Sequence, residues 1–114
     1  MKKLAFFSLI IAFLVSIGTF SFAETFKIGV HGPTTGPAAE VGRYIKNGSL
    51  MALDDINSQG GILGKRVEVV FGDTESKPEV GVSVFEKFMT RDKVDIVIGG
   101  LHSSVNIAER RSIQ

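Results

Sequence analysis

Cysteine is absent from this sequence of 114 residues. No disulfide can therefore stabilise the folded chain, and its core has to be held together by packing. The same absence removes the residue through which a bacterial lipoprotein carries its lipid anchor. Proline is scarce, with three residues, and no tract rich in proline, serine or glycine separates one domain from another. We therefore expect one folded unit that depends on packing alone.

A long membrane-spanning run is also lacking. The longest apolar stretch, residues 4–15, follows Lys2 and Lys3 and precedes Ser21-Phe22-Ala23. A span needs about 20 consecutive apolar residues, whereas a basic start, a short apolar centre and a small-residue end are typical of a secretory signal peptide. We predict that residues 1–23 are cleaved after Ala23, with a membrane anchor as the alternative. The mature part, residues 24–114, would then be periplasmic, without a lipid anchor or membrane insertion.

An excess of basic charge is missing as well. Loss of Lys2 and Lys3 leaves 11 of the 13 basic residues against 12 acidic ones, so the formal charge changes from +1 to −1 (11 − 12). Proteins that bind nucleic acids usually carry a basic patch or stripe. The sequence therefore predicts no nucleic-acid partner.

Cofactor motifs are incomplete. The second glycine of the segment 29–36 comes one position too late for the dinucleotide-binding pattern GxGxxG. In the segment 59–66, Gln59 replaces the leading glycine of a phosphate-binding P-loop, and Arg66 replaces its Ser or Thr. Two histidines without cysteine partners do not indicate a metal site. We predict neither a cofactor nor a metal.

Signals of a hydrolase are weak. Ser103 or Ser104 could form a triad with His102 or His31 and with Asp73, but neither serine lies in a G-x-S-x-G elbow. A triad is defined by geometry, and these residue types are common. We predict no catalytic residues, and an envelope hydrolase stays an alternative.

Apolar periodicity predicts alternating strands and helices, in the order β-α-β-α-β followed by the start of another helix. Such alternation is typical of parallel strands joined by right-handed crossovers. If the strands lie in the order 2-1-3, the chain returns to the other side of strand 1. We predict a three-layer α/β fold in which the first helix covers one face and the later helices cover the other. Some apolar residues of the third strand would then be exposed. The expected strands are residues 26–30, 67–71 and 94–98, and the first helix is 38–58, with Val41, Ile45, Gly48, Ala52 and Ile56 on its apolar side.

A ligand crevice is expected between strands 1 and 3, where the strand order reverses. The loops 31–37 and 100–104 would line it. Gly99 and Gly100 allow close approach to the backbone, and the N–H groups of the following helix favour a carboxylate or another anion. We predict that Ser103 contacts the ligand and that Ser104 caps the helix.

The mature chain resembles the amino-terminal part of the periplasmic solute-binding proteins of the branched-chain amino acid family, which serve ABC importers. The resemblance runs through "KIGV", "TTGPAAEVG", "NGSLMALDDINSQGGILGKRVEVVFGDTESKP" and "KVDIVIGGLHSSV", and "DINSQGGILGKRVEVV" is its most specific part. It implies a type I periplasmic-binding-protein fold, with residues 24–114 forming only part of the first lobe of a leucine-binding protein domain.

The resemblance also implies a function. An amino acid or an amino acid-like solute would be held between two lobes and delivered to an ABC-type inner-membrane permease, without catalysis. The contacts would come from Ser103, Ser104 and the backbone near His102, with Thr35 and Gly36 in the loop that borders the same pocket. Members that bind aliphatic amino acids often have tyrosine at the position of Val41. Branched-chain amino acids, amides, urea and aromatic acids therefore stay open as ligands, and an envelope sensor or a truncated remnant is the alternative function.

Overall fold

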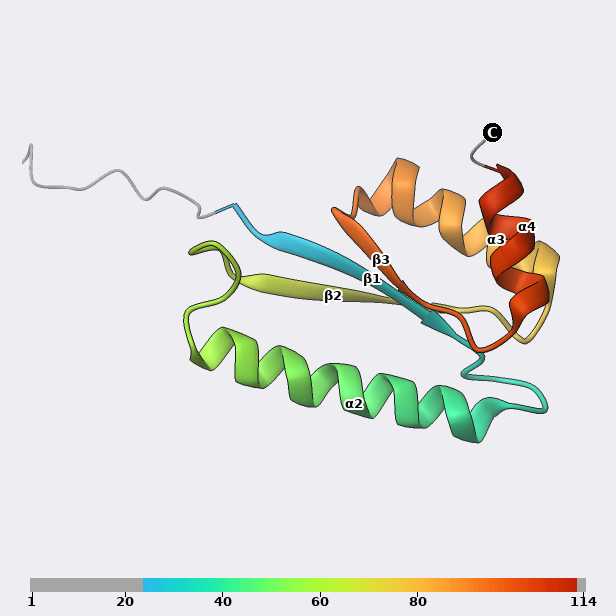
Figure 1. The fold of residues 1–114 in the computed structure, drawn as a ribbon, viewed down its shortest axis with the longest axis horizontal. Coiled ribbons are helices and arrows are strands. Elements are labelled where there is room, and N and C mark those ends of the chain that lie inside the picture. Colours follow the sequence, from blue (N-terminus) through green and yellow to red (C-terminus); the bar gives the residue numbers. More distant parts are fainter. Residues whose placement is uncertain (1–23, 113–114) are drawn as a thin grey trace, which may run out of the picture.

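Strands alternate with helices along residues 24–112, the part of the chain that the computed structural model describes (Figure 1). The predicted signal peptide, residues 1–23, lies outside the described residues. Within residues 24–112, no helix combines the length and the apolar character needed to cross a membrane. The elements are β1 (Phe26–Gly32), α2 (Ala39–Ser58), β2 (Val67–Asp73), α3 (Pro78–Lys87), a π-helical turn η1 (Phe88–Asp92), β3 (Ile96–Gly99) and α4 (Ser103–Ser112).

The three strands are parallel, which confirms the predicted fold class, and they lie in the order β2-β1-β3, which meets the condition for the expected crevice. β1 is two residues longer than predicted, because His31 pairs with Gly72 and Gly32 pairs with Asp73 at its far end. The prediction that His31 and Gly32 belong to a loop is therefore wrong.

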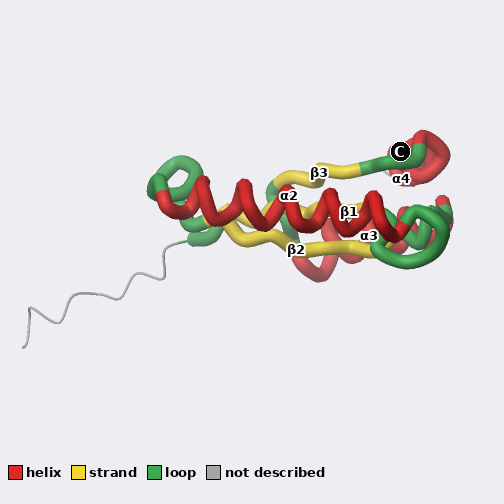
Figure 2. Tube along the Cα trace, turned by 90° about the horizontal axis from the view of Figure 1, so that it is seen from below, coloured by secondary structure: helices red, strands yellow, loops and turns green. Residues whose placement is uncertain are grey.

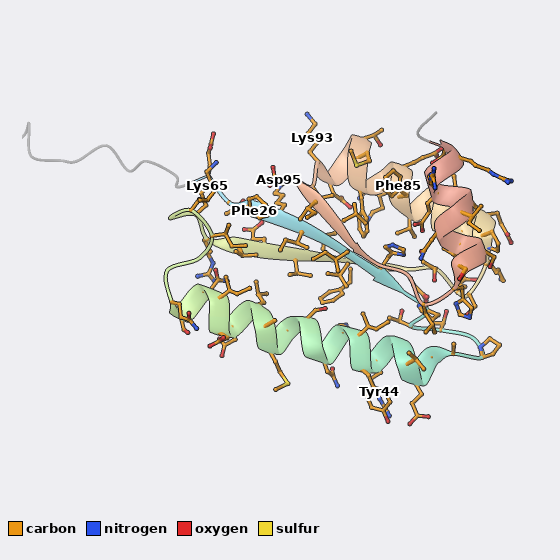
Figure 3. All side chains as sticks on the ribbon, in the orientation of Figure 1. Phe26, Tyr44, Lys65, Phe85, Lys93 and Asp95 are labelled. Carbon is orange, nitrogen blue, oxygen red and sulfur yellow. The ribbon has the colours of Figure 1, made fainter. Side chains whose placement is uncertain are left out.

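Helix α2 lies along β1 and β2 on one face of the sheet, with β3 to one side (Figures 1 and 2). Tyr44 points away from the sheet on the outer side of this helix (Figure 3). The apolar side was only partly predicted. Val41, Gly48 and Ala52 are exposed, because the inward side of the helix runs instead through Gly42, Ile45, Leu53 and Ile56. The core of this face consists of Ile28, Val30 and Val67 from the sheet, with Ile45, Leu53 and Ile56 from α2 packed against them.

Helices α3 and α4 lie on the opposite face (Figure 1). Glycines in the sheet make room for them there. A Cβ atom at Gly29 would lie 2.7 Å from the ring of Phe88, and one at Gly72 would collide with Val84. Phe88 is fully buried in the space that these glycines leave. The two helix layers on opposite faces agree with the predicted three-layer arrangement.

Strand β3 forms an edge of the described sheet. Ile96 and Ile98 are 47% and 53% exposed, because they face the side of α2 and this helix covers β1 and β2 instead. Val94, just before the strand, is buried. The predicted exposure of apolar residues in this strand is therefore confirmed for the two isoleucines.

Candidate functional site

Two loops come together at the edge of the sheet where its parallel strands end. One connects β1 to α2 and contains Thr35 and Gly36; the other connects β3 to α4 and contains His102. Figure 1 shows both loops at the same end of the sheet, as the sequence predicts. Lys65 and Asp95 lie toward the other end (Figure 3).

Thr35 is held by the carboxylate of Asp73. Its hydroxyl donates to Asp73 Oδ2 over 2.6 Å, and its backbone N–H donates to Oδ1 over 3.3 Å. Oδ1 also accepts the N–H groups of Thr34 and Glu75, each over 2.9 Å. The loop after β1 is therefore tied to the end of β2.

The charge of Asp73 is stabilised by these donors. Burial acts in the opposite direction and raises the pKa of Asp73, but the hydroxyl of Thr35 and the N–H groups of Glu75, Thr34 and Thr35 together lower this pKa to about 2. Asp73 is therefore ionised at neutral pH and all its described donors belong to the protein's own loops. Its task is to position the loop, a role that sequence reasoning missed.

Gly36 has a conformation that suits glycine, since its φ is 80°. Its carbonyl accepts the N–H of Ala39 over 3.2 Å at the start of α2. Next to it, Pro33 is pressed against the helix so closely that a Cβ atom at Gly42 would collide with the Pro33 carbonyl. Thr35 and Gly36 are themselves exposed.

The corner after β3 is built on two glycines with positive φ, Gly99 (149°) and Gly100 (104°). Helix α4 begins at Ser103, and the carbonyl of His102 accepts the N–H groups of Val105 and Asn106 over 3.1 and 3.2 Å. The prediction that Ser104 caps this helix is wrong, because Ser104 already lies in its first turn.

Both serines are exposed on that first turn. The first N–H groups of a helix have no carbonyl partner within the helix, so this turn offers an anion backbone donors together with two hydroxyls. His102 is half-buried, and its Nδ1 has no hydrogen-bond partner among the described residues. The structure thus places Ser103, Ser104 and His102 on one corner, and Thr35 and Gly36 on the adjacent loop.

The alternative triad is not assembled. Asp73 is bound by Thr35, and His31 lies inside β1 with its Nδ1 3.4 Å from Glu109 Oε1. Residues 24–112 also contain no group of three His, Cys, Asp or Glu side chains placed to hold a metal ion. The arrangement can position and bind a polar solute, and it offers a serine nucleophile no oriented base.

An open hollow of about 650 Å³ lies beside the first of these loops. It is lined by Thr34 and by Ala39, Glu40, Arg43 and Lys46 of α2. The corner formed by His102, Ser103 and Ser104, called the serine corner below, does not contribute to this hollow. We therefore centre the candidate site on the two loops and not on this hollow.

Comparison with known proteins gives a consistent relationship. The family described as periplasmic binding protein matches residues 25–111. The Leu/Ile/Val-binding protein homolog 2 of Brucella abortus (strain 2308) is 39% identical over 107 residues, which are 94% of this chain and 28% of that protein. A leucine-, isoleucine-, valine-, threonine- and alanine-binding protein of Pseudomonas aeruginosa is 40% identical over 82 residues, 72% of this chain and 22% of that protein.

Solved structures agree. The branched-chain amino acid transporter substrate binding protein LivJ from Streptococcus pneumoniae, solved in complex with isoleucine, has a TM-score of 0.72 at 36% identity, over 75% of this chain and 25% of that one. The chain therefore spans about a quarter of the length of these relatives. Profile, sequence and fold together show that the chain belongs to the branched-chain amino acid binding family of periplasmic binding proteins.

Proposed function

We propose that the chain supplies part of the ligand-binding lobe of a periplasmic solute-binding protein that takes up an amino acid or an amino acid-like solute. The observation that carries this proposal is the exposed first turn of α4, where Ser103 and Ser104 offer hydroxyls and backbone donors at the edge of the sheet. A carboxylate fits such a helix start. The Asp73 carboxylate, through its hydrogen bonds from Thr34, Thr35 and Glu75 (the Asp73 clamp), holds Thr35 and the adjacent Gly36 on the neighbouring loop.

The relatives supply the class of ligand. Their names specify leucine, isoleucine and valine, and the Pseudomonas protein also binds threonine and alanine. We propose an amino acid ligand on this basis, delivered to an ABC-type inner-membrane permease after export by the predicted signal peptide. The role is binding without catalysis, which the unassembled triad supports.

Binding by the 114 residues alone is expected to be weak, because the second lobe that closes over the solute in two-lobed binders is not part of this sequence. Titration of the ¹⁵N-labelled protein with L-leucine, L-isoleucine and L-valine, followed by NMR, tests the site. We expect millimolar affinity, with shifts at residues 35–36 and 102–104. Ser103→Ala should weaken these shifts, whereas Ser83→Ala, on the exposed side of α3, should leave them unchanged.

Shifts confined to other surfaces, or none at saturating amino acid, would count against the site. Micromolar affinity would contradict the expectation that one lobe is insufficient. Transport and sensing are separated by the neighbouring genes: a permease and an ATPase favour import, and a kinase or chemoreceptor favours an envelope sensor. The reading frame beyond the Gln114 codon distinguishes a receptor from a truncated remnant.

A further inference from the structure

His31 and Glu109 face each other between the sheet and α4. Their residues are 4% and 6% exposed, and His31 Nδ1 lies 3.4 Å from Glu109 Oε1. Both atoms are closed to solvent, and neither has a hydrogen-bond partner among the described residues. Burial of a polar atom without a partner is costly. The distance between the two atoms leaves each as the available partner of the other.

The elements packed around this pair present no other charged group to it among the described contacts. The residues in register with His31 are Gly72 on β2 and Gly99 on β3. A Cβ atom at Gly81 of α3 would lie 2.9 Å from Glu109 Oε1, so glycine faces the carboxyl group from that side. The carboxylate of Asp73, at the end of β2, is engaged by Thr34, Thr35 and Glu75. Each group is therefore the partner that has to neutralise the charge of the other.

The number of protons on the pair follows from its chemistry. Without a shared proton Glu109 is a buried carboxylate. Either the Nδ1 lone pair of His31 repels it, or the other neutral tautomer donates Nδ1–H to it and leaves a buried negative charge without a counter-charge. With two protons on the pair, a buried imidazolium would be left without a counter-charge. With one proton the pair is neutral overall and forms one hydrogen bond. Burial points the same way, since it lowers the pKa of His31 and raises that of Glu109 to about 7.

We propose that His31 and Glu109 hold a single proton in common in the folded protein, with the Glu109 hydroxyl donating to His31 Nδ1, and that this proton docks α4 on β1. The proposal does not depend on the proposed function, although α4 carries the serine corner at its other end. The sequence patterns assign no role to Glu109, and the triad considered for His31 is not assembled, because its Nδ1 faces Glu109.

The shared proton determines how the stability of the folded chain depends on pH. The ordinary pKa values are 6.5 for His31 and 4.5 for Glu109. Between these values the unfolded chain also holds one proton on the two groups, on the histidine, so folding neither takes up nor releases a proton from them. Stability that depends on this pair should then be independent of pH in that window.

Single variants should break this balance in opposite directions. In Glu109→Gln only the buried histidine titrates. The equilibrium constant for folding should therefore increase as pH rises to 6.5, by up to about tenfold per pH unit. In His31→Val only the buried carboxyl titrates. The equilibrium constant for folding should therefore decrease by a similar factor per pH unit as pH rises from 4.5 to about 7. The double variant removes both effects and serves as the baseline for all other groups.

Urea unfolding of the four proteins between pH 4.5 and pH 6.5 measures these slopes. We expect a flat difference between the wild type and the double variant, with opposite slopes for the two single variants. Slopes of the same sign, or no slopes, would overturn the proposal.

The wild type gives a second measurement that needs no variant to fold. NMR of the two histidine rings should show His31 neutral, with its proton on Nε2, from pH 5 to pH 7. His102, which has no glutamate partner among the described residues, serves as the internal control, and His102→Gln assigns its signals. A His31 ring that gains a proton near pH 6.5 in the folded protein would refute the shared proton.

Discussion

Thr35 donates its hydroxyl hydrogen to Asp73 Oδ2 over 2.6 Å and so joins the loop after β1 to the end of β2. The other carboxylate oxygen accepts N–H groups from Thr34 and from Glu75, which lies on the loop before α3. One side chain thus fixes two loops at the edge of the sheet. The position of the candidate ligand loop therefore depends on a residue of a different element, β2.

Replacing Asp73 by alanine should destabilise the fold by about 2 kcal/mol. A hydrogen bond to a charged group contributes about 1.5–3 kcal/mol, and the partial exposure of this site to solvent keeps the total near the value of one such bond. Urea unfolding measures the loss. Asp54→Ala is the matched control, since Asp54 is an exposed aspartate on α2 and should change stability little. Equal effects of the two substitutions would show that the clamp contributes nothing.

Acid should remove the same contribution. The pKa of Asp73 is about 2 in the folded chain against an ordinary value of 3.8, so its stabilisation is complete above pH 3.8 and is lost as pH falls toward 2. We expect the difference in unfolding free energy between the wild type and Asp73→Asn to shrink by about 1 kcal/mol between pH 5 and pH 2, a value discounted for solvent screening. A constant difference over this range would contradict the assignment.

Much of the fold could be predicted because each element carries its own pattern. Alternating strands and helices, with right-handed crossovers, are enough to predict parallel strands with helices on both faces of the sheet. The order 2-1-3 follows only from the pairing of β1 with both other strands. The end of β1 could not be read in this way. His31-Gly32-Pro33 has the composition of a turn, and only pairing with Gly72 and Asp73 of β2 extends the strand through it.

For the candidate site, the position of the two loops was predictable but their details were not. Parallel strands that end at one edge put Thr35 and Ser103 on adjacent loops, which local patterns reveal. The start of α4 depends instead on the backbone of Gly100 and His102, so Ser104 looked like a cap and is not one. The Asp73 clamp joins residues 38 positions apart, and no local signal in the sequence reports it.

One side-chain amide joins the C-terminal end of α2 to β2. Asn57 Nδ2 donates to the Val67 carbonyl over 2.9 Å, and the Val67 N–H donates to Asn57 Oδ1 over 2.8 Å. Asn57→Ala should therefore cost about 2 kcal/mol, the loss of two partly buried hydrogen bonds. Asn47→Ala, on the exposed side of the same helix, should be neutral or slightly stabilising, because alanine is the better helix former. Thermal unfolding of both variants measures the difference. Equal melting temperatures would show that the two hydrogen bonds of Asn57 do not contribute to stability.

Two glycines in helices should respond to alanine with opposite signs. A Cβ atom at Gly48 meets nothing within 4 Å, so Gly48→Ala should stabilise α2 by up to about 1 kcal/mol. A Cβ atom at Gly81 would collide with Val105 and crowd Glu109, so Gly81→Ala should separate α3 from α4 at a cost of about 1–3 kcal/mol. A higher melting temperature for Gly81→Ala would show that the contact between these helices is looser than the structure has it.

The exposed isoleucines of β3 should promote self-association of this chain. An apolar edge strand offers both unpaired backbone groups and an apolar side to another molecule. Ile96, at 47% exposure, can be changed without opening the core, and a lysine on an edge strand opposes pairing with another strand. Ile96→Lys should therefore lower the fraction of oligomers in sedimentation velocity runs.

Ile107→Lys is the control for this last substitution. Ile107 is 52% exposed on α4, so the same change of charge and a similar loss of apolar surface occur away from a strand edge. If association proceeds through the edge of β3, Ile107→Lys should associate like the wild type while Ile96→Lys stays monomeric. An equal reduction in both variants would instead show that loss of exposed apolar surface at either place lowers association, and that the edge of β3 is not its route.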